Sequence, residues 1–389
     1  MRILVVAQHY WPSVGGAETV LRRLTRSWVA AGESVEVWTG RWDETLLAEE
    51  NDSGVRILRH PVTRVRWLGT VLYVRLLARM LAERGREFDV VYVSMLKHAA
   101  WACVTACRKV GIPVVLRPEG AGATGDAVWQ DKAWLGGSIR AACREAADLV
   151  TLSEEIETEL LARGYPAERL HRIPNGTPIP ELPWSRAAAP AARARRGLPD
   201  APLAVYTGRL HPGKGLGDLV EAIGLLAAKG SNWRAALVGE GPARAELETL
   251  AREKGVADRI ALPGAVAEVE DWLRAAEAFV LPSYYEGLSI ALLEALALGV
   301  PCLVSDIPAN RSVLQAEWLP TFPPRNPAAL AAALESLPTR THDVDGQRRE
   351  TAARYDVAIA ARRHLERFAS LRAPKTGGSQ SSAGGAAPK

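Results

Sequence analysis

The sequence predicts an α/β protein with two parallel sheets, each covered by helices on both faces. Short apolar segments alternate with helical segments along almost the whole chain, and near-continuous apolar strands are typical of parallel sheets that are buried on both faces. The alternation starts afresh after residue 200. The chain has 389 residues, which is enough for two domains of about 100–200 residues each.

The predicted strands and helices follow one another regularly in each half. In the first half, apolar runs predict strands at 2–7, 35–38, 55–59, 89–93, 113–117 and 148–152. In the second half, they predict strands at 203–207, 234–239, 259–262, 278–281 and 301–304. Helical spacing predicts helices at 16–31, 66–86, 215–229 and 241–254, and a last long one at 347–371. This alternation predicts doubly wound parallel sheets.

A segment rich in Pro, Ala and Arg separates the two halves. It spans residues 178–202 and has the composition of a linker followed by a short basic helix. We therefore expect an N-terminal domain at 1–180 and a C-terminal domain at 181–349. Residues 372–389 are rich in Gly, Ser and Ala without an apolar period, which predicts a disordered tail.

The composition excludes several classes of protein. With 48% hydrophobic and 24% charged residues, the chain is neither disordered nor fibrous. The formal net charge of +4 is too small to indicate a nucleic-acid partner. The four cysteines show no CxxC pair and no zinc spacing. We find no secretory signal and no apolar run that could span a membrane, which predicts a cytoplasmic location.

A glycine-containing loop follows the first strand of the first half, at the edge of a parallel sheet where ligands bind. Gly15 and Gly16 lie in this loop, directly before a predicted helix. Glycines let a ligand approach the backbone closely, and a helix N-terminus attracts anions. An ordinary strand–helix turn explains this segment equally well.

The corresponding loop of the second half, GRLHPGKG at 208–215, nearly matches a phosphate-binding P-loop. Gly215 stands where a P-loop has the Ser or Thr that binds magnesium, so an ATPase is not favoured. The loop still carries two cations, Arg209 and Lys214, beyond the end of a predicted strand. These residues suit a diphosphate.

The most specific segment is SYYEGLSIALLEALALGVP at 283–301. Ser289 is suited to cap a helix and Gly299 to end it, so the helix between them is apolar apart from Glu294. A lone carboxylate on a buried helix needs a partner. The spacing lets Glu294 face the crevice toward which the helix N-terminus points, and Glu286 lies in the loop just before. A structural ion pair is the alternative role for Glu294.

Taken together, these motifs resemble a known family. The ordered set contains GGAE, IPNG, TGRLHPGKG, LVGEGP and two glutamates separated by seven residues. It is similar to that of the retaining family-4 glycosyltransferases of the GT-B fold, and the similarity covers residues 1–370. The resemblance implies two Rossmann-like domains that face a central cleft, with a C-terminal helix at 350–371 packed back on the first domain.

The resemblance also implies an activity and the residues that perform it. Members of the family take a sugar from a nucleoside-diphosphate sugar without a metal or other cofactor. By position, Arg209 and Lys214 match the diphosphate-binding cations, Glu294 the acid that holds the donor ribose, and Glu286 the acid beside the transferred sugar. The remaining donor-binding positions that match are Gly15, Gly16, Val266, Gly287, Leu288 and Ser289.

Three further acidic residues, Glu119, Asp343 and Asp345, lie at candidate sites. Many relatives have a His where this chain has Glu119 in Arg117-Pro118-Glu119, so either Glu119 or Arg117 inherits its role, or the site differs. We assign Glu119 to the catalytic set with Glu286, Arg209 and Lys214. The pair at Asp343 and Asp345 looks like the metal-binding motif of other sugar transferases, but its place in a polar loop favours a helix-capping role.

The expected function is therefore the transfer of a sugar to a saccharide or lipid-linked acceptor, in the synthesis of cell-surface polysaccharide or glycolipid. A sugar-nucleotide epimerase of the same fold and a non-catalytic protein that binds sugar nucleotides are the alternatives. The sequence names neither the base, the sugar nor the acceptor.

A basic segment in the first half suggests one more partner. On the predicted helix 66–86, Arg75, Arg79 and Arg86 share one stripe, with apolar residues just before them. Such a stripe can rest on an anionic membrane surface, which would make the enzyme peripheral to the inner face. A core-packed helix with a solvated cationic face is the alternative.

Overall fold

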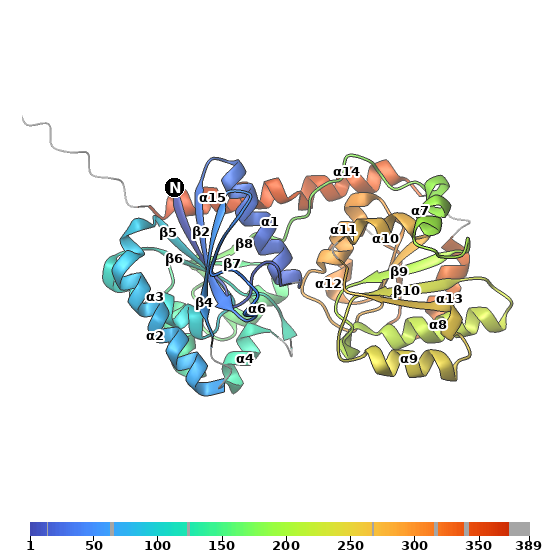
Figure 1. Cartoon of the computed structure of the whole chain (residues 1–389), viewed down its shortest axis with the longest axis horizontal. Coiled ribbons are helices and arrows are strands. Elements are labelled where there is room, and N and C mark those ends of the chain that lie inside the picture. Colours follow the sequence, from blue (N-terminus) through green and yellow to red (C-terminus); the bar gives the residue numbers. More distant parts are fainter. Residues whose placement is uncertain are drawn as a thin grey trace, which may run out of the picture.

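The computed structural model describes residues 1–13, 15–62, 66–122, 125–266, 268–314, 318–337 and 342–372. Only the backbone is described for Arg66 and Trp67. Apart from Arg372, the predicted disordered tail lies outside the described residues. The described chain forms two halves, each with its own sheet flanked by helices (Figure 1).

The first half is built on an eight-stranded sheet with the order β3-β4-β2-β1-β5-β6-β7-β8. All neighbouring strands in it are parallel except β3 and β4. The strands are β1 (Arg2–Val6), β2 (Ser34–Arg41), β3 (Glu49–Asp52), β4 (Val55–Pro61), β5 (Val90–Ser94), β6 (Val114–Arg117), β7 (Asp148–Thr151) and β8 (Leu170–Arg172). The helices are α1 (Gly16–Ala30), α2 (Arg66–Arg84), α3 (His98–Val110), α4 (Asp126–Lys132), α5 (Gly136–Arg144) and α6 (Glu154–Leu161).

Side chains of β1 show why this sheet is covered on both faces. Leu4 and Val6 pack in one apolar cluster with α2 and α3, whereas Ile3 and Val5 pack in another with α1. Successive side chains of a strand point to opposite faces. A strand whose last four side chains are all apolar therefore needs helices on both sides, which is the arrangement that the sequence predicts.

The second half is built on a six-stranded sheet of parallel strands with the order β11-β10-β9-β12-β13-β14. One large apolar cluster fills both sides of it. The strands are β9 (Leu203–Thr207), β10 (Arg234–Val238), β11 (Ile260–Gly264), β12 (Ala278–Leu281), β13 (Cys302–Ser305) and β14 (Thr321–Phe322). The helices are α7 (Ala189–Arg195), α8 (Leu216–Ala228), α9 (Arg244–Glu253), α10 (Glu270–Ala275), α11 (Ile290–Leu298), α12 (Pro308–Arg311) and α13 (Pro327–Ser336).

The predicted long helix at the end of the chain is two helices. α14 (Val344–Tyr355) and α15 (Val357–Ser370) are separated at Asp356, which adopts an extended backbone and caps α15 through a hydrogen bond from the backbone N–H of Ala358. The predictions of a single helix at 347–371 and of a single C-terminal helix at 350–371 were therefore wrong, because the helix is interrupted at Asp356. α14 packs on α11 of the second half, and α15 packs on α1 of the first (Figure 1).

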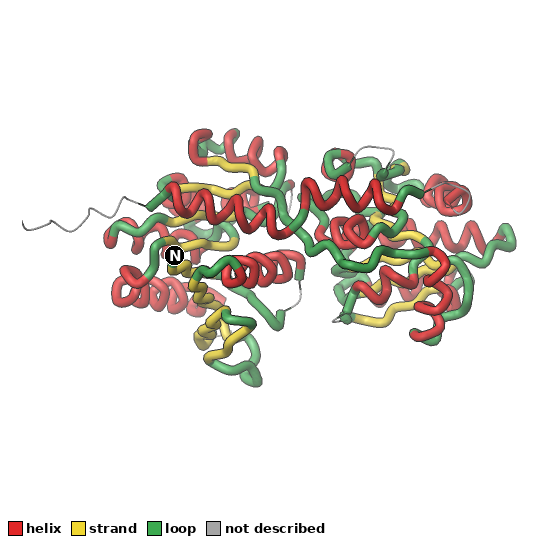
Figure 2. Tube along the Cα trace, turned by 90° about the horizontal axis from the view of Figure 1, so that it is seen from above, coloured by secondary structure: helices red, strands yellow, loops and turns green. Residues whose placement is uncertain are grey.

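Two chain segments run side by side where the halves join. The chain crosses from the first half to the second near Thr177 and crosses back near Asp356. The backbone N–H of Thr177 donates to the carbonyl of Tyr355 (2.8 Å), and its carbonyl accepts from the N–H of Val357 (3.1 Å). A Cβ on Gly176 would lie 2.5 Å from the Cα of Val357, so a glycine is required at this approach. Seen from above, both crossings pass between the two halves (Figure 2).

Other differences from the predicted elements are local. α2 ends at Arg84 rather than at residue 86, because a single 3₁₀ turn at Gly85–Glu87 follows it. The short strands β3, β8 and β14 were not predicted. No helix in the described part of the chain is long and apolar enough to cross a membrane.

Candidate active site

The N-terminus of α11 has the form that the sequence predicts. The Ser289 side chain accepts a hydrogen bond from the N–H of Leu292 (3.3 Å), and Gly299 ends the helix with φ = 91°. The backbone N–H groups of Gly287, Leu288 and Ser289 donate to no acceptor that the structure describes. Such groups, together with the positive end of a helix dipole, form a site for an anion.

The cationic loop after β9 packs tightly against the loop before α11. Gly215 has φ = 62°, and a Cβ there would lie 2.1 Å from the carbonyl oxygen of Pro282. A Cβ on Gly213 would meet the Tyr285 side chain, and the N–H of Tyr284 donates to the carbonyl of Gly213 (3.0 Å). Glycines are therefore required for these two loops to meet, which brings Lys214 next to the loop that leads into α11.

Lys214 and Glu286 form an ion pair at this junction. The Lys214 Nζ lies 2.7 Å from Glu286 Oε1, and the Ser283 hydroxyl donates to the same oxygen at 2.7 Å. Only 8% of the Glu286 side chain is exposed. Arg209, in contrast, is exposed and makes no ion pair with any residue that the structure describes. Its charge is free to meet an anionic ligand.

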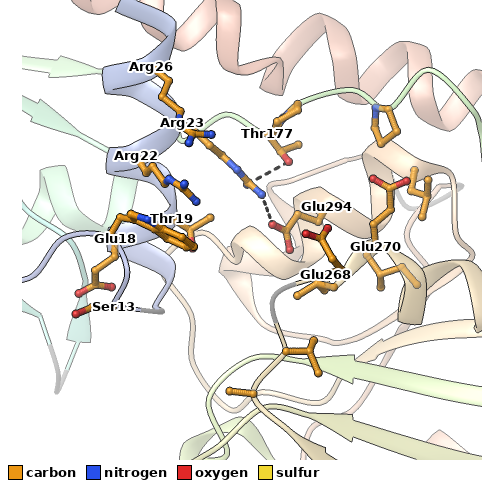
Figure 3. Close-up of a pocket in the computed structure, with 18 residues that line it drawn as sticks. Ser13, Glu18, Thr19, Arg22, Arg23, Arg26, Thr177, Glu268, Glu270 and Glu294 are labelled. Atoms are coloured by element: carbon orange, nitrogen blue, oxygen red, sulfur yellow. Dashed lines mark hydrogen bonds and ion pairs between the residues drawn. The ribbon is translucent and has the colours of Figure 1, made fainter. Parts of the chain in front are cut away.

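A cavity of about 550 Å³ lies between the two halves (Figure 3). Two of the predicted donor-binding residues line it, namely Glu294 of α11 and Val266 of the loop after β11. α1 forms the opposite wall. The predicted residues Arg209, Lys214, Glu286 and Glu119 are not among the described residues that line it.

Glu294 forms an ion pair across the cavity with Arg23 of α1. The sequence analysis gave a structural ion pair as the alternative role of Glu294 but did not identify its partner. Arg23 Nη2 lies 2.5 Å from Glu294 Oε1, and Arg23 Nη1 lies 3.4 Å from the Thr177 hydroxyl (Figure 3). Glu294 thus has the ion-pair partner that its burial requires, and that partner comes from the other half. The one signal in the sequence was three arginines at positions 22, 23 and 26, directly after the GGAE loop.

The other two arginines of this wall are held within the first half. Arg22 and Arg26 both donate to the carboxylate of Asp52 at the end of β3. Burial of Asp52 favours its neutral form, but the hydrogen bonds from the two guanidinium groups outweigh burial and lower its pKa to about 2. The Arg22 guanidinium also lies 3.3 Å from the ring centroid of Trp11.

The glycine loop of the first half reaches the N-terminus of α11. A Cβ on Gly16 would lie 3.9 Å from Cγ1 of Ile290, the first residue of α11. Gly15 directly precedes α1 and leaves room for the Glu18 side chain, which lines the cavity. Burial raises the pKa of Glu18.

Glu119 lies two residues beyond the carboxyl end of β6, in a polar cluster that leaves 11% of its side chain exposed. Its carboxylate accepts hydrogen bonds from the Arg117 guanidinium and from the Ser94 hydroxyl (2.7 Å). Burial raises the pKa of Glu119 against these two partners, and the nearby charge of Glu18 adds to the increase. The charge of Glu18 links Glu119 electrostatically to the cavity wall.

Asp343 caps α14, and Asp345 is an acidic residue in the first turn of the same helix. The Asp343 carboxylate accepts from the N–H of Gly346 (2.8 Å) at the start of α14. In the described part of the chain, no group of three or more His, Cys, Asp and Glu side chains is placed to hold a metal ion.

Comparisons with known families match both halves of the chain. Residues 15–176 match the model described as "Glycosyl transferase 4-like domain", and residues 201–339 match "Glycosyl transferases group 1". The glycosyltransferase EpsF of Bacillus subtilis is 27% identical over 75% of this chain and 76% of its own length. A GDP-mannose-dependent alpha-(1-6)-phosphatidylinositol monomannoside mannosyltransferase of Mycobacterium tuberculosis is 27% identical over 78% of this chain and 80% of its own.

Solved structures match the fold over almost the whole chain. Sucrose-phosphate synthase from Thermosynechococcus elongatus superposes with a TM-score of 0.78 at 22% identity, covering 95% of this chain and 98% of that one. HepE of Anabaena, crystallised in complex with UDP-glucose, superposes with a TM-score of 0.76 at 19% identity, covering 95% of this chain and all of that one. At these identities the likeness establishes the fold alone.

Proposed function

The chain belongs to the group 1 glycosyltransferases and has the predicted GT-B fold, and from that premise we propose that it transfers a sugar from a nucleoside-diphosphate sugar to a saccharide or lipid-linked acceptor. One observation supports this proposal most strongly. The backbone N–H groups of Gly287, Leu288 and Ser289, just before α11, have no acceptor among the described residues and lie in the same loop as Glu286 of the Lys214–Glu286 ion pair. We further propose that the reaction retains the anomeric configuration and needs no metal.

The diphosphate would bind at the N-terminus of α11. Breaking a glycosyl–phosphate bond builds negative charge on the leaving diphosphate, and fixed cations and N–H groups stabilise that charge. Arg209 and Lys214 would supply the cations, and Gly16 would approach from the first half. A relative whose name makes it GDP-mannose-dependent and a structural neighbour crystallised with UDP-glucose support this class of donor.

The nucleoside would occupy the cavity between the halves. Glu294 and Val266 line the same space, so a ribose bound by the Glu294 carboxylate would direct its base toward Val266. Glu286 would contact the transferred sugar from the other side of the helix N-terminus. Both hydrogen bonds to Glu286 end on Oε1, which leaves Oε2 able to accept from a sugar hydroxyl.

Glu119 would position the acceptor or act as its general base. Its pKa is raised and so lies closer to neutral pH than that of an ordinary glutamate. A carboxylate whose pKa is closer to the working pH is a better general base. Arg117, fully buried beneath it, holds the carboxylate in place rather than meeting the substrate. Of the two residues that could inherit the role of the family's His, the structure therefore favours Glu119.

Product analysis tests this function. The chain is incubated with a panel of nucleotide sugars, with and without membrane lipid extract and soluble saccharides. Transfer predicts nucleoside diphosphate and a new glycoside only when an acceptor is present. Conversion of the nucleotide sugar without an acceptor would show an epimerase instead, and binding without turnover would show a non-catalytic protein.

A lipid-linked acceptor is supported by an exposed stripe on α2. Leu68 and Leu72 are exposed, and Arg75 and Arg79 follow on the same face at i+7 and i+11 from Leu68. Arg86 is exposed too, but it lies in the turn beyond the helix, so the predicted stripe ends earlier than expected. Arg79 is paired with the exposed Glu83 (2.8 Å), so Arg75 with the apolar residues before it contributes most to an attraction toward an anionic membrane surface.

Liposome flotation at low salt measures this membrane binding. We expect the chain to float with anionic vesicles and not with neutral ones. The double variant Arg75→Gln/Arg79→Gln should bind less, because each basic residue near the surface contributes about 1 kcal/mol. The control Arg252→Gln/Arg349→Gln removes the same charge from exposed positions elsewhere. Equal flotation of both variants, or none for the unaltered chain, would favour a soluble acceptor.

A further inference from the structure

The two halves are tied together inside the cavity by the Arg23–Glu294 ion pair. Arg23 belongs to α1 of the first half and Glu294 to α11 of the second, 271 positions apart in the sequence. Their side chains are 23% and 19% exposed, so the pair is partly shielded from water. Figure 3 shows Arg23 reaching across the cavity toward Glu294 and Thr177.

Arg23 is the only one of the three arginines in this wall that can serve Glu294. Arg22 and Arg26 are committed to Asp52. Arg23 has only the long contact to Thr177 beside its bond to Glu294. No other described side chain donates to Glu294.

A ribose needs the same oxygen atoms. Two vicinal hydroxyls bind a carboxylate best when each donates to a different oxygen, and Arg23 already occupies Oε1. A hydroxyl and a guanidinium cannot both donate to that oxygen along the same direction. The Arg23 guanidinium also lies in the cavity in front of this carboxylate, so a ribose that binds both oxygens of Glu294 has to displace it from that space.

We propose that Arg23 competes with the donor ribose for Glu294, so that nucleotide binding breaks a contact that holds the two halves together. This inference rests on the proposed function, because it takes the ligand of Glu294 to be a ribose. Thr177, the second contact of Arg23, lies where the chain crosses between the halves and is bonded there to Tyr355 and Val357. Release of Arg23 thus loosens the contact between the halves close to the crossing, while the donor binds.

Nucleotide affinity in Arg23→Gln tests the competition. Titration calorimetry with UDP, GDP and ADP identifies the nucleotide that the unaltered chain binds most tightly. Arg23→Gln should bind this nucleotide about three- to tenfold more tightly, because no ion pair has to be broken first. The 2′,3′-dideoxy form of the same nucleotide lacks the hydroxyls, and its affinity should change less than twofold.

Matched variants separate competition from a general effect of charge. Arg252→Gln removes the same charge from an exposed position on α9, outside the cavity, and keeps the Arg23–Glu294 pair, so it should not tighten binding. Arg23→Lys keeps a cation for Glu294 and should restore the original affinity within about twofold. In a Glu294→Gln background, Arg23→Gln should have no further effect on affinity.

The outcomes are distinguishable. If the ribonucleotide binds the unaltered chain and Arg23→Gln leaves its affinity unchanged or lowers it, the competition is overturned while the donor site stands. Equal gains for the ribonucleotide and its dideoxy form would also overturn it. If none of the three nucleotides binds the unaltered chain, the donor assignment itself fails and the inference with it.

Discussion

At the scale of single residues, the site is a set of charges whose partners decide their use. Lys214 is paired with Glu286 and Glu294 with Arg23, whereas Arg209 has no ion-pair partner among the described residues. The residue types and their order were predictable, because the loop and helix that carry them are local in sequence. The Arg23–Glu294 pair was not, because it depends on how the two halves approach each other.

Arg209 and Glu294 should be indispensable for donor turnover. Arg209→Ala removes the cation that we propose stabilises the leaving diphosphate, and Glu294→Gln removes the carboxylate that we propose orients the ribose. We expect each to lower kcat/KM for the donor by about 100-fold or more. Arg252→Ala, an exposed arginine on α9, is the matched control. Near-normal rates in folded Arg209→Ala and Glu294→Gln would contradict the site.

At the scale of elements, glycines and short polar strands decide the local geometry. The apolar strands were predictable from composition, whereas β3 (Glu49–Asp52) was not, because its sequence, EEND, is polar and only pairing with β4 makes it a strand. The break between α14 and α15 had a local signal, since Asp356 is a good helix cap. Periodicity alone joins the two helices into one.

The contact between the two loops of the proposed donor site should depend on Gly215. Gly215→Ala adds a Cβ about 2.1 Å from the Pro282 carbonyl, which displaces the loop and should raise the donor KM several-fold. Gly230→Ala is the control, because Gly230 has a similar φ of 79° but nothing within 4 Å of its Cβ. Both variants carry the same backbone strain. Equal donor kinetics in the two variants would mean that the contact has no role.

Arg22 and Arg26 link α1 to β3 through Asp52. This link should contribute stability that depends on pH. The lowered pKa of Asp52 means that its contribution is complete above its ordinary pKa of 3.8 and is lost as the pH falls toward 2. Asp52→Asn should lower the free energy of unfolding at pH 7 by about 1–2 kcal/mol and flatten its acid dependence between pH 4 and 2. Denaturant unfolding at a series of pH values measures both. An unchanged acid dependence would show that Asp52 is not the responsible group.

At the scale of the whole molecule, two separate sheets are held together by the end of the chain. Phe368 of α15 packs with Trp28 and Tyr92 in the core of the first half, while α14 stays on the second half. The sequence predicts that each half has its own sheet, because each pattern of strands and helices is local. How far the halves close on the cavity could not be predicted, since it depends on contacts such as Arg23–Glu294 that span the chain.

Donor turnover after complete removal of divalent metal tests the central claim most directly. Arg209, Lys214 and the N-terminus of α11 are proposed to stabilise the diphosphate in place of a metal ion. Release of nucleoside diphosphate in the presence of acceptor is measured with saturating EDTA, and again after addition of manganese. We predict that the chelator leaves the rate largely unchanged. Loss of activity with EDTA, restored by manganese, would contradict the account.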